Sequence, residues 1–487
     1  MSTMLDLKTA ATESGVAAAD DTSGHLANTE IYIDPEMEKR VMRKFDYYML
    51  PQFAVLPFVL FLDRSNIGNA RVFGFEESLH FKGNDFGNVN TIFYASYVVF
   101  EIPWVMALKR WGANVIIPIS FVCWSLVTLG TGFVQNFGQT VALRVLLGVF
   151  EAGLFPGLTF LISTIYSREA QAMRVAILYA AGCLSGAFGG LIAYGIQTMG
   201  EQRGLEAWRW LFIIEGSISV VLCGIAWFTL PKNAEVAWFL TPEEREMMQK
   251  RKMRDILYKG DDEFSWNYAK MAFKDVQIYL AAACAFASSI PLFGLANFMP
   301  TIIRGLGYTS YQANYLTIPI YLFSTMTLYT GAWLSDRYRR RALIAVCGTL
   351  PVILGYAILL GTDNVGAGYF AMYMCAGGIY IYNTVLYTWL ANNLKPDYKR
   401  SVGIPLFASL SNISGTVSSQ IYPSADGPRY IMGSAVSMGM EVVALMGTVA
   451  IYFLLRSRNM KKQKLINEGA TTNEKDGDKA LDFEYIL

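Results

Sequence analysis

Two ionisable residues lie in the middle of a long apolar stretch, Val141–Gly157. Arg144 and Glu151 are seven residues apart, which is two turns of an α-helix, so both side chains share one face about 10 Å apart along the axis. A charge at the depth of a bilayer is costly and normally marks the path of a substrate or an ion. A second pair, Asp63 and Arg64, closes the first apolar segment. Two such pairs in apolar segments predict a membrane transporter that handles an anion and a proton.

The composition is that of a membrane protein. Of the 487 residues, 53% are hydrophobic and only 16% are charged, against about 25% charged residues in soluble proteins. The net charge is +1 and no basic stripe is present, so nothing predicts a nucleic-acid partner. No signal peptide is expected, because the polar N-terminus up to about Pro35 lacks a basic region, an apolar region and a cleavage site. The first span can itself serve for insertion. The cysteines lie in apolar stretches without metal-ligand spacing, which predicts packing roles: Cys123, Cys183, Cys223, Cys284, Cys347 and Cys375.

Twelve apolar segments are long enough to cross a bilayer, which takes roughly 20 mostly apolar residues. Six precede a polar, charged stretch at residues 231–275 and six follow it. The sequence therefore predicts an all-α protein of two six-helix halves, 45–230 and 276–456, with cytosolic tails at 1–44 and 457–487. The first of these tails is expected to be disordered. The expected spans lie near 47–68, 86–107, 114–134, 139–165, 171–198, 208–230, 276–300, 312–335, 341–361, 367–393, 402–423 and 430–456.

Local signals fix the linker and the orientation. Thr241 can cap a linker helix that has Pro242 at its first position and acids in its first turn. Lysine and arginine concentrate in the segments on the side of the N-terminus, so both termini are expected in the cytosol. In the fifth span, Gly186 and Gly190 form a small-xxx-small face. Close helix packing is one interpretation of these glycines, and a pliable helix between two rocking halves is the other.

The span count and one loop resemble the major facilitator superfamily. Between spans 8 and 9 the chain reads Gly-Ala-Trp-Leu-Ser-Asp-Arg-Tyr-Arg-Arg-Arg from Gly331 to Arg341. This is similar to that family's motif of a glycine, an Asp-Arg pair and a basic cluster. The matching loop between spans 2 and 3, Ala107–Gly112, keeps the basic residues and the glycine but lacks the acid. The resemblance implies alternating access between the two halves, with Asp336 and Arg337 in a gating role.

Further stretches resemble the anion:cation symporter family within that superfamily, and its fungal allantoate and nicotinate permeases in particular. They are Leu62–Gly68, Phe93–Pro103, Arg144–Gly157 and Trp208–Gly216. The end of the chain, Asp482–Leu487, resembles the terminus of fungal members, which usually have Arg where Glu484 stands. Members carry nicotinate, allantoate, pantothenate, biotin and other carboxylates, generally with protons. The resemblance therefore implies a small organic anion as the substrate.

Arg64 and Arg144 are the expected substrate-binding residues. A guanidinium stays charged and can bind a carboxylate with two hydrogen bonds, and matching positions in the family contact the substrate carboxylate. Two alternatives stay open: Arg64 as a residue that reaches lipid headgroups, and Arg144 as a structural partner of Glu151. Tyr97 is a further candidate, which either donates a hydrogen bond to a substrate oxygen or satisfies a neighbouring carbonyl.

Asp63 and Glu151 are the expected proton-coupling residues, with Glu101 as a further candidate. Burial disfavours an ionised carboxylate while a nearby guanidinium favours it, so such an acid can load a proton on one side and release it on the other. We expect protonation to free the arginines for the substrate. The alternative is that Arg144 keeps Glu151 ionised and the pair only holds its helix. Glu215 and Glu441 are further acids in spans, and helix packing is the simpler role for Glu215.

The C-terminal half is expected to supply the opposite wall of the site. Asn297 and Asn383 are its candidate substrate ligands, since an amide can read a ring or a carboxamide, although it can equally join helices. Other residues of its apolar segments have the same two possible roles: Phe293, Tyr380, Tyr382, Tyr387, Trp389, Asn392, Asn393 and Asn412.

The sequence thus predicts a secondary active transporter, monomeric and in the plasma membrane, that moves a small organic anion with protons. An exporter or uniporter of an acidic metabolite is the main alternative. A transport-dead nutrient sensor is disfavoured by the short tail after Arg456. No phosphate-binding Gly-x-x-x-x-Gly-Lys-Ser/Thr loop is present, and His25 and His80 belong to no triad or metal cluster. Nothing therefore predicts an enzyme, a cofactor or a metal.

Overall fold

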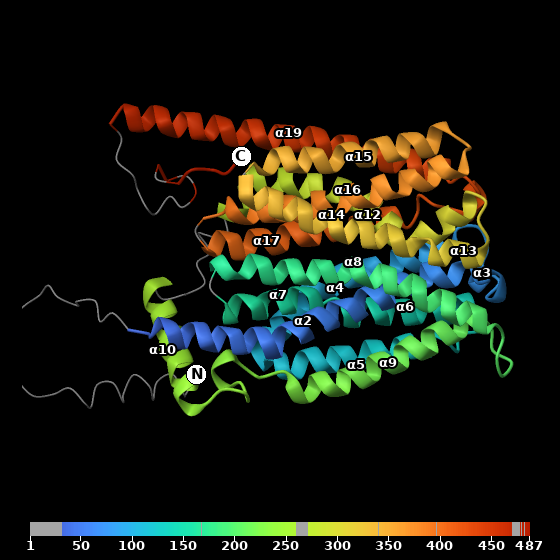
Figure 1. Ribbon diagram of the computed structural model, residues 1–487, viewed down its shortest axis with the longest axis horizontal. Coiled ribbons are helices and arrows are strands. Elements are labelled where there is room, and N and C mark those ends of the chain that lie inside the picture. Colours follow the sequence, from blue (N-terminus) through green and yellow to red (C-terminus); the bar gives the residue numbers. More distant parts are fainter. Residues whose placement is uncertain are drawn as a thin grey trace, which may run out of the picture.

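The structure is a computed structural model in which the described elements are helices (Figure 1). It describes residues 32–166, 168–259, 271–338, 340–395, 397–469, 478, 480, 481 and 483–487. Most of the predicted N-terminal tail, residues 1–31, and residues 260–270 of the predicted linker lie outside this part of the chain.

The helices of the first half follow the expected spans closely. They begin with α2, whose N-cap Asp34 accepts a hydrogen bond from the Glu36 amide at 3.1 Å, with Pro35 at the first helical position. Asp and Pro are favoured at these two places. The helices are α2 (Pro35–Arg71), α3 (Phe75–Ser78), α4 (Asp85–Trp111), α5 (Ala113–Thr131), α6 (Phe137–Glu151), α7 (Leu154–Ile165), α8 (Arg168–Met199) and α9 (Ala207–Thr229).

The predicted linker helix is α10 (Pro242–Lys259), preceded by a short 3₁₀ turn at Ala234–Val236. The Glu244 amide donates to the Thr241 hydroxyl at 3.4 Å, and the Glu244 carboxylate accepts from the Thr241 amide at 2.9 Å. This reciprocal pair is a capping box, so the predicted cap is confirmed. The same carboxylate lies 2.8 Å from Lys44 of α2, which ties the linker helix to the first half.

The second half also follows the expected spans. Its helices are α12 (Val276–Gly305), α13 (Ser310–Tyr315), α14 (Thr317–Tyr338), α15 (Arg341–Gly361), α16 (Val365–Asn392), α17 (Asp397–Asn412), α18 (Ser414–Ser418) and α19 (Ile431–Asn467), with a 3₁₀ turn at Ser424–Asp426. The last helix runs well past the expected membrane boundary, because its polar end continues as helix until Gly469 takes a positive φ of 82°.

Within the described ranges, nine helices are long and apolar enough to cross a membrane. The other expected spans correspond to α14, α16 and the pair α17 and α18. Length and composition explain why these helices are not among the nine. α17 has only 16 residues, and α14 and α16 are rich in Thr, Tyr and Gly. α16 packs against both α14 and α15, so it is covered by its own half.

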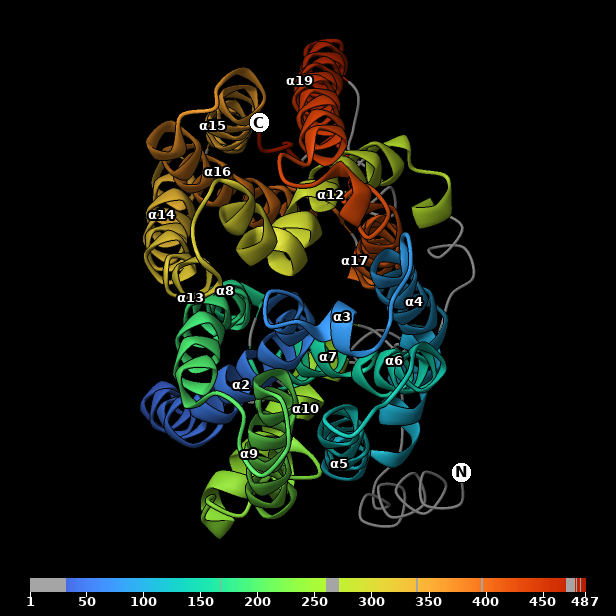
Figure 2. The same ribbon diagram turned by 90° about the vertical axis from the view of Figure 1, so that its right-hand side faces the viewer.

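The helices form two bundles that lie side by side (Figure 2). The first contains α2 and α4–α9, and the second contains α12–α19. The bundles meet where α8 contacts α13 and α14, where α2 contacts α12, and where α4 contacts α17 and α18. The molecule is therefore a twelve-span membrane protein of two six-helix halves. The start of α2, α10 and the last residues of the chain lie at one end, and α3 and α13 lie at the other (Figure 1).

The two glycines of the fifth span lie at this junction. A methyl group added at Gly186 would overlap the ring of Tyr321 on α14, and one at Gly190 would meet Thr317 and the Asn314 carbonyl. The predicted close-packing face is thus confirmed, and its partner is the opposite half.

The fourth span is interrupted directly after Glu151. Pro156 cannot donate a hydrogen bond to the Ala152 carbonyl, and its ring would clash with that carbonyl in a continuous helix. α6 therefore ends at Glu151 and α7 begins at Leu154. Interrupted helices in transporters mark the depth at which substrates and ions bind.

Candidate functional site

Arg64 and Glu151 form a buried ion pair. The Arg64 Nη2 atom lies 3.2 Å from Glu151 Oε2, and its Nε atom lies 3.4 Å from the same oxygen. The Glu151 side chain is 0% exposed and that of Arg64 is 9% exposed. The pair joins the end of α2 to the break between α6 and α7, so Arg64 faces the protein interior rather than lipid headgroups.

The Arg64 guanidinium is also surrounded by aromatic rings. Its Cζ atom lies 4.8 Å from the ring centroid of Tyr97, 5.2 Å from that of Phe93 and 5.6 Å from that of Phe61. Cations are attracted to aromatic faces at these distances. Tyr97 therefore lies next to Arg64, as expected for a residue of the same site.

Arg144 is buried and forms no direct ion pair among the residues that the structure describes. Its relative exposure is 2%, and within this part of the chain its Nε atom has no hydrogen-bond partner. Glu151, its expected partner on the same helix, is bound directly to Arg64, although its charge still acts on Arg144 through space. The second Glu151 oxygen, Oε1, likewise has no hydrogen-bond partner among the described residues.

Asp63 forms hydrogen bonds to other helices of the first half. Its Oδ2 atom accepts hydrogen bonds from Trp124 Nε1 at 3.1 Å and from Ser219 Oγ at 3.4 Å, while Oδ1 has no partner among the described residues. These donors come from α5 and α9. The neighbouring residues Asp63 and Arg64 therefore have different hydrogen-bond partners, because successive helical side chains point about 100° apart, while the charge of Glu151 acts on both.

Glu101 connects the two halves. Its Oε2 atom accepts hydrogen bonds from Ser409 Oγ at 3.5 Å and Asn412 Nδ2 at 3.4 Å, both on α17. The acid is 5% exposed. It is thus a contact between α4 and α17, one turn from Tyr97.

The two asparagines expected to bind the substrate have different surroundings. Asn297 Nδ2 donates to the Tyr94 hydroxyl at 3.2 Å, a contact from α12 to α4 across the two halves. Asn383 instead lies within the second half, where it donates to Ser288 at 3.2 Å and accepts from Ser289 at 3.3 Å. Of the two asparagines, only Asn297 contacts the half that holds Arg64, through its hydrogen bond to Tyr94.

The remaining candidates of the second half are distributed over several contacts. Tyr387 lies 6.0 Å from Tyr179 of α8 and Phe293 lies 5.0 Å from Tyr94, both between ring centroids and both across the halves. Tyr382 bonds to Thr448 at 2.9 Å inside its own half. Trp389 and Asn393 bind the end of the chain, which a reading of the spans alone did not indicate.

Asp336 and Arg337 lie at the α10 end of the molecule. Asp336 forms an ion pair of 2.9 Å with Arg341 at the start of α15, and it is largely exposed. Arg337 lies over the Trp333 ring at 5.7 Å. Both contacts are within the second half.

Several polar residues of the site were missed in the sequence. Asn66 donates to Glu215, whose other oxygen has no partner, and Trp124 and Ser219 bind Asp63. Asn66 lies one turn after Asp63, and this spacing was the available signal. Trp124 and Ser219 gave none, because a tryptophan and a serine are ordinary residues in an apolar helix.

Hydrogen bonds between the two halves are concentrated at the end of the molecule where α3 and α13 lie. Gln420 binds Asn84, Asn88 and Thr91 of α4 and the turn before it. Arg71 Nη2 donates to Ser424 at 2.7 Å, and Asn314 donates to Gln197 at 3.2 Å. Gly68 allows α2 to approach the backbone of α12 at Asn297. The structure is therefore closed at this end.

Comparisons with known proteins agree on the fold. A solved bacterial homologue of the human lysosomal transporter Spinster, in an inward-facing and unoccupied conformation, has a TM-score of 0.65 and 18% identity over 86% of this chain and 97% of its own. A solved D-xylose–proton symporter has a TM-score of 0.64 and 11% identity over 84% and 97%.

Relatives in sequence are fungal transporters. An uncharacterised transporter of Schizosaccharomyces pombe is 38% identical over 97% of this chain and 94% of its own. The high-affinity nicotinic acid transporter of Saccharomyces cerevisiae is 35% identical over 92% and 85%. A major facilitator-type transporter of Emericella nidulans is 30% identical over 94% and 95%. The family model of the major facilitator superfamily matches residues 53–419. With this match over the helices that hold Arg64, Arg144 and Glu151, the chain belongs to the major facilitator superfamily and is a multi-pass membrane transporter.

Proposed function

We propose that the protein is a proton-coupled symporter of a small organic anion, a carboxylate, which works by alternating access. The observation that carries the proposal is Arg144, a buried guanidinium that forms no direct ion pair among the described residues. A buried charge is costly unless it is paired. A substrate carboxylate that binds between Arg144 and Arg64 supplies the missing partner.

Glu151 is the proposed proton carrier. When it is ionised, it holds Arg64 in the pair of 3.2 Å. A proton on Glu151 cancels its charge and releases the Arg64 guanidinium, which then binds the substrate together with Arg144. Release of the substrate and the proton on the other side restores the pair. Asp63 is the second proposed proton site, since its Oδ1 atom has no hydrogen-bond donor. Asp336 and Arg337 keep the gating role proposed for them from the sequence.

The rings around Arg64 favour a planar substrate. Phe61, Phe93 and Tyr97 surround the guanidinium, so an aromatic acid can place its carboxylate on the arginines and its ring on these faces. The nicotinic acid transporter among the relatives supports nicotinate as the first substrate to test. We place the protein as a monomer in the plasma membrane, with the start of α2 and the end of the chain in the cytosol.

The test is uptake of radiolabelled nicotinate and other carboxylates into proteoliposomes, with and without an inward proton gradient. We expect uptake driven by the gradient in the unaltered protein. In Glu151→Gln, uptake should no longer respond to the gradient. Glu441→Gln is the matched control, because Glu441 is an equally buried acid on α19 whose hydrogen-bond partner is Ser288 of the second half. Uptake that is independent of the gradient in the unaltered protein contradicts the proposal and favours a uniporter or an exporter.

A further inference from the structure

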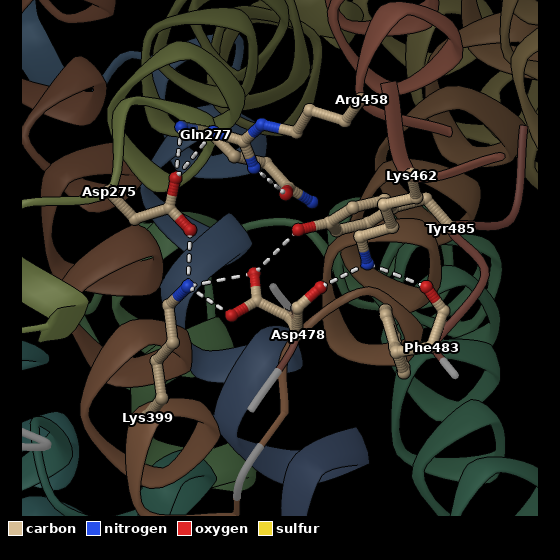
Figure 3. Close-up of polar contacts among 8 residues, drawn as sticks. All are labelled: Asp275, Gln277, Lys399, Arg458, Lys462, Asp478, Phe483 and Tyr485. Atoms are coloured by element: carbon tan, nitrogen blue, oxygen red, sulfur yellow. Dashed lines mark hydrogen bonds and ion pairs between the residues drawn. The ribbon is translucent and has the colours of Figure 1, made fainter. Parts of the chain in front are cut away.

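Residues near the end of the chain form polar contacts with buried side chains of the second half (Figure 3). Residue 478 and residues 483–487 contact α15, α16, α17 and α19. These contacts use buried polar side chains on both partners, so the tail is part of the fold rather than a loose end.

Lys399 of α17 is the centre of the first contact. The lysine is 1% exposed and lies 2.8 and 2.9 Å from the two carboxylate oxygens of Asp478, which is 0% exposed. It also binds Asp275, the N-cap of α12. Burial alone would raise the pKa of Asp275, but the Lys399 ammonium and the Arg458 guanidinium hold it below the ordinary value. A tail carboxylate therefore completes a buried charge cluster that joins α12, α17 and α19.

Lys462 of α19 holds the tail by its backbone. Its Nζ atom donates to the carbonyls of Asp478 and Phe483, both at 2.6 Å. The same atom lies 4.3 Å from the ring centroid of Tyr485 and 5.2 Å from that of Phe483. The Tyr485 hydroxyl in turn donates to Asp478 at 3.1 Å. One lysine thus contacts two carbonyls and two aromatic rings of the tail.

Two asparagine amides pair with the tail backbone in the way that a neighbouring strand does. Asn459 accepts from the Tyr485 amide at 3.0 Å and donates to its carbonyl at 2.8 Å. Asn393 accepts from the Ile486 amide at 2.8 Å and donates to its carbonyl at 3.0 Å, and Trp389 donates to that carbonyl at 2.7 Å. These contacts satisfy both backbone polar groups of residues 485 and 486.

The terminal residue reaches the beginning of a helix. The Leu487 main-chain oxygen accepts a hydrogen bond of 2.9 Å from the amide of Arg341, the first residue of the 21-residue helix α15. Amides in the first turn of a helix have no partner within the helix, so this contact satisfies one of them and attaches Leu487 to α15.

We propose that the second half carries a binding site for a C-terminal segment, Asp478 and residues 483–487, in which the Asp478 carboxylate is the anchoring charge, and that the occupied site holds the ends of α12, α15, α16, α17 and α19 together as one body. We name this segment the C-terminal clasp. The proposal does not depend on which substrate is carried. It implies that loss of the Asp478 carboxylate releases the clasp.

The first test uses the full chain. A spin label at Glu484→Cys, an exposed position of the clasp, reports its mobility after the exposed Cys347 is replaced by Ala. We expect an immobilised label in this protein. We expect a mobile label, with a lower midpoint of thermal unfolding, after Asp478→Ala. Glu468→Ala, a change in an exposed residue at the end of α19, is the matched control and should leave both readouts unchanged.

The second test measures binding directly. A chain that ends at Glu468 keeps α19 whole and should bind a fluorescent peptide with the sequence of residues 478–487. The same peptide with Asp478→Asn should bind at least about 10-fold more weakly, as expected for the loss of a charge-assisted hydrogen bond. Equal binding of the two peptides, or a mobile label in the unaltered full chain, overturns the proposal. Transport is not a readout, so these results are independent of the proposed symport.

Discussion

A guanidinium enclosed between helices is stable only if something balances its charge, and this makes Arg144 the residue to change first. Arg144→Gln removes the charge and the pair of N–H donors that can face a carboxylate. Uptake of the substrate should therefore fall by about 10-fold or more, the range expected for hydrogen bonds to a charged group. Arg144→Lys keeps the charge but loses the two-pronged geometry and should recover only part of the affinity. The measurement is the concentration dependence of uptake in proteoliposomes. Full affinity in Arg144→Gln would contradict the substrate role.

The pair of Arg64 and Glu151 allows stability to be separated from transport. Arg64→Gln or Glu151→Gln alone leaves one buried charge uncompensated, and such a change costs about 3–5 kcal/mol. The double substitution leaves no charge, so the thermal unfolding midpoint should return toward that of the unaltered protein while transport stays lost. Additive losses of stability in the double variant would show that the two residues are not coupled.

The sequence identified the charged residues of the site, but it did not show which side chains pair with each other. The apolar surroundings of Arg64, Arg144 and Glu151 identified them as residues of interest. The partner of Glu151 is 87 residues away on another helix, whereas the sequence offered only Arg144 on the same helix. Asp63 was grouped with Arg64 by adjacency, although the two side chains point to different helices.

At the scale of elements, two glycines of α8 with different surroundings can be compared within one helix. Gly190→Ala adds a methyl group that meets Thr317 and the Asn314 carbonyl of the other half. The contact between α8 and α13 should then open, and a cysteine placed at Asn84 should react faster with a membrane-impermeant thiol reagent. Gly195→Ala is the control, because nothing lies within 4 Å of its added methyl group. Equal reactivity in the two variants would mean that the α8 contact does not hold this end closed.

The capping box of α10 responds to pH. Burial opposes ionisation of Glu244, but its hydrogen bonds with Lys44 and Thr241 together lower its pKa below the ordinary value of 4.5. A lowered pKa in the folded state means that the contact stabilises the protein above pH 4.5 and is lost as the pH falls below the folded pKa. We expect a protease to cut α10 (Pro242–Lys259) faster at a pH below the folded pKa of Glu244 than at pH 7. Glu244→Gln should show the fast rate at both pH values.

Element positions could be predicted because membrane spans follow from hydropathy and length. The interruptions could not be placed in the same way. Pro156 indicates where a helix breaks only when the beginning of that helix is already known. The end of α17 at Asn412 coincides with its contact to Glu101 on the other half, which is a tertiary contact without a local signal.

For the whole molecule, the two-halves architecture follows from the six-plus-six count and agrees with the solved transporters. The division at residues 231–275 remains a proposal, since residues 260–270 lie outside the described part. The conformational state, that is, which end of the transporter is closed in this structure, could not be predicted from the sequence. Both ends of a transporter must close in turn, and the same residues therefore serve two sets of contacts of similar free energy.

The closed end gives a direct test of alternating access. Asn84 and Gln420 bond to each other across the halves, so two cysteines at these positions can be joined by a short reversible thiol cross-linker. The cross-link should abolish transport because the halves can no longer separate there, and a reducing agent should restore it. The matched control joins Ser78 and Glu206, which bond to each other at the same end but within the first half. Transport should survive that cross-link. If transport also survives the cross-link between Asn84 and Gln420, the two halves do not part at this end, and the rocking motion that couples Glu151 to the substrate is wrong.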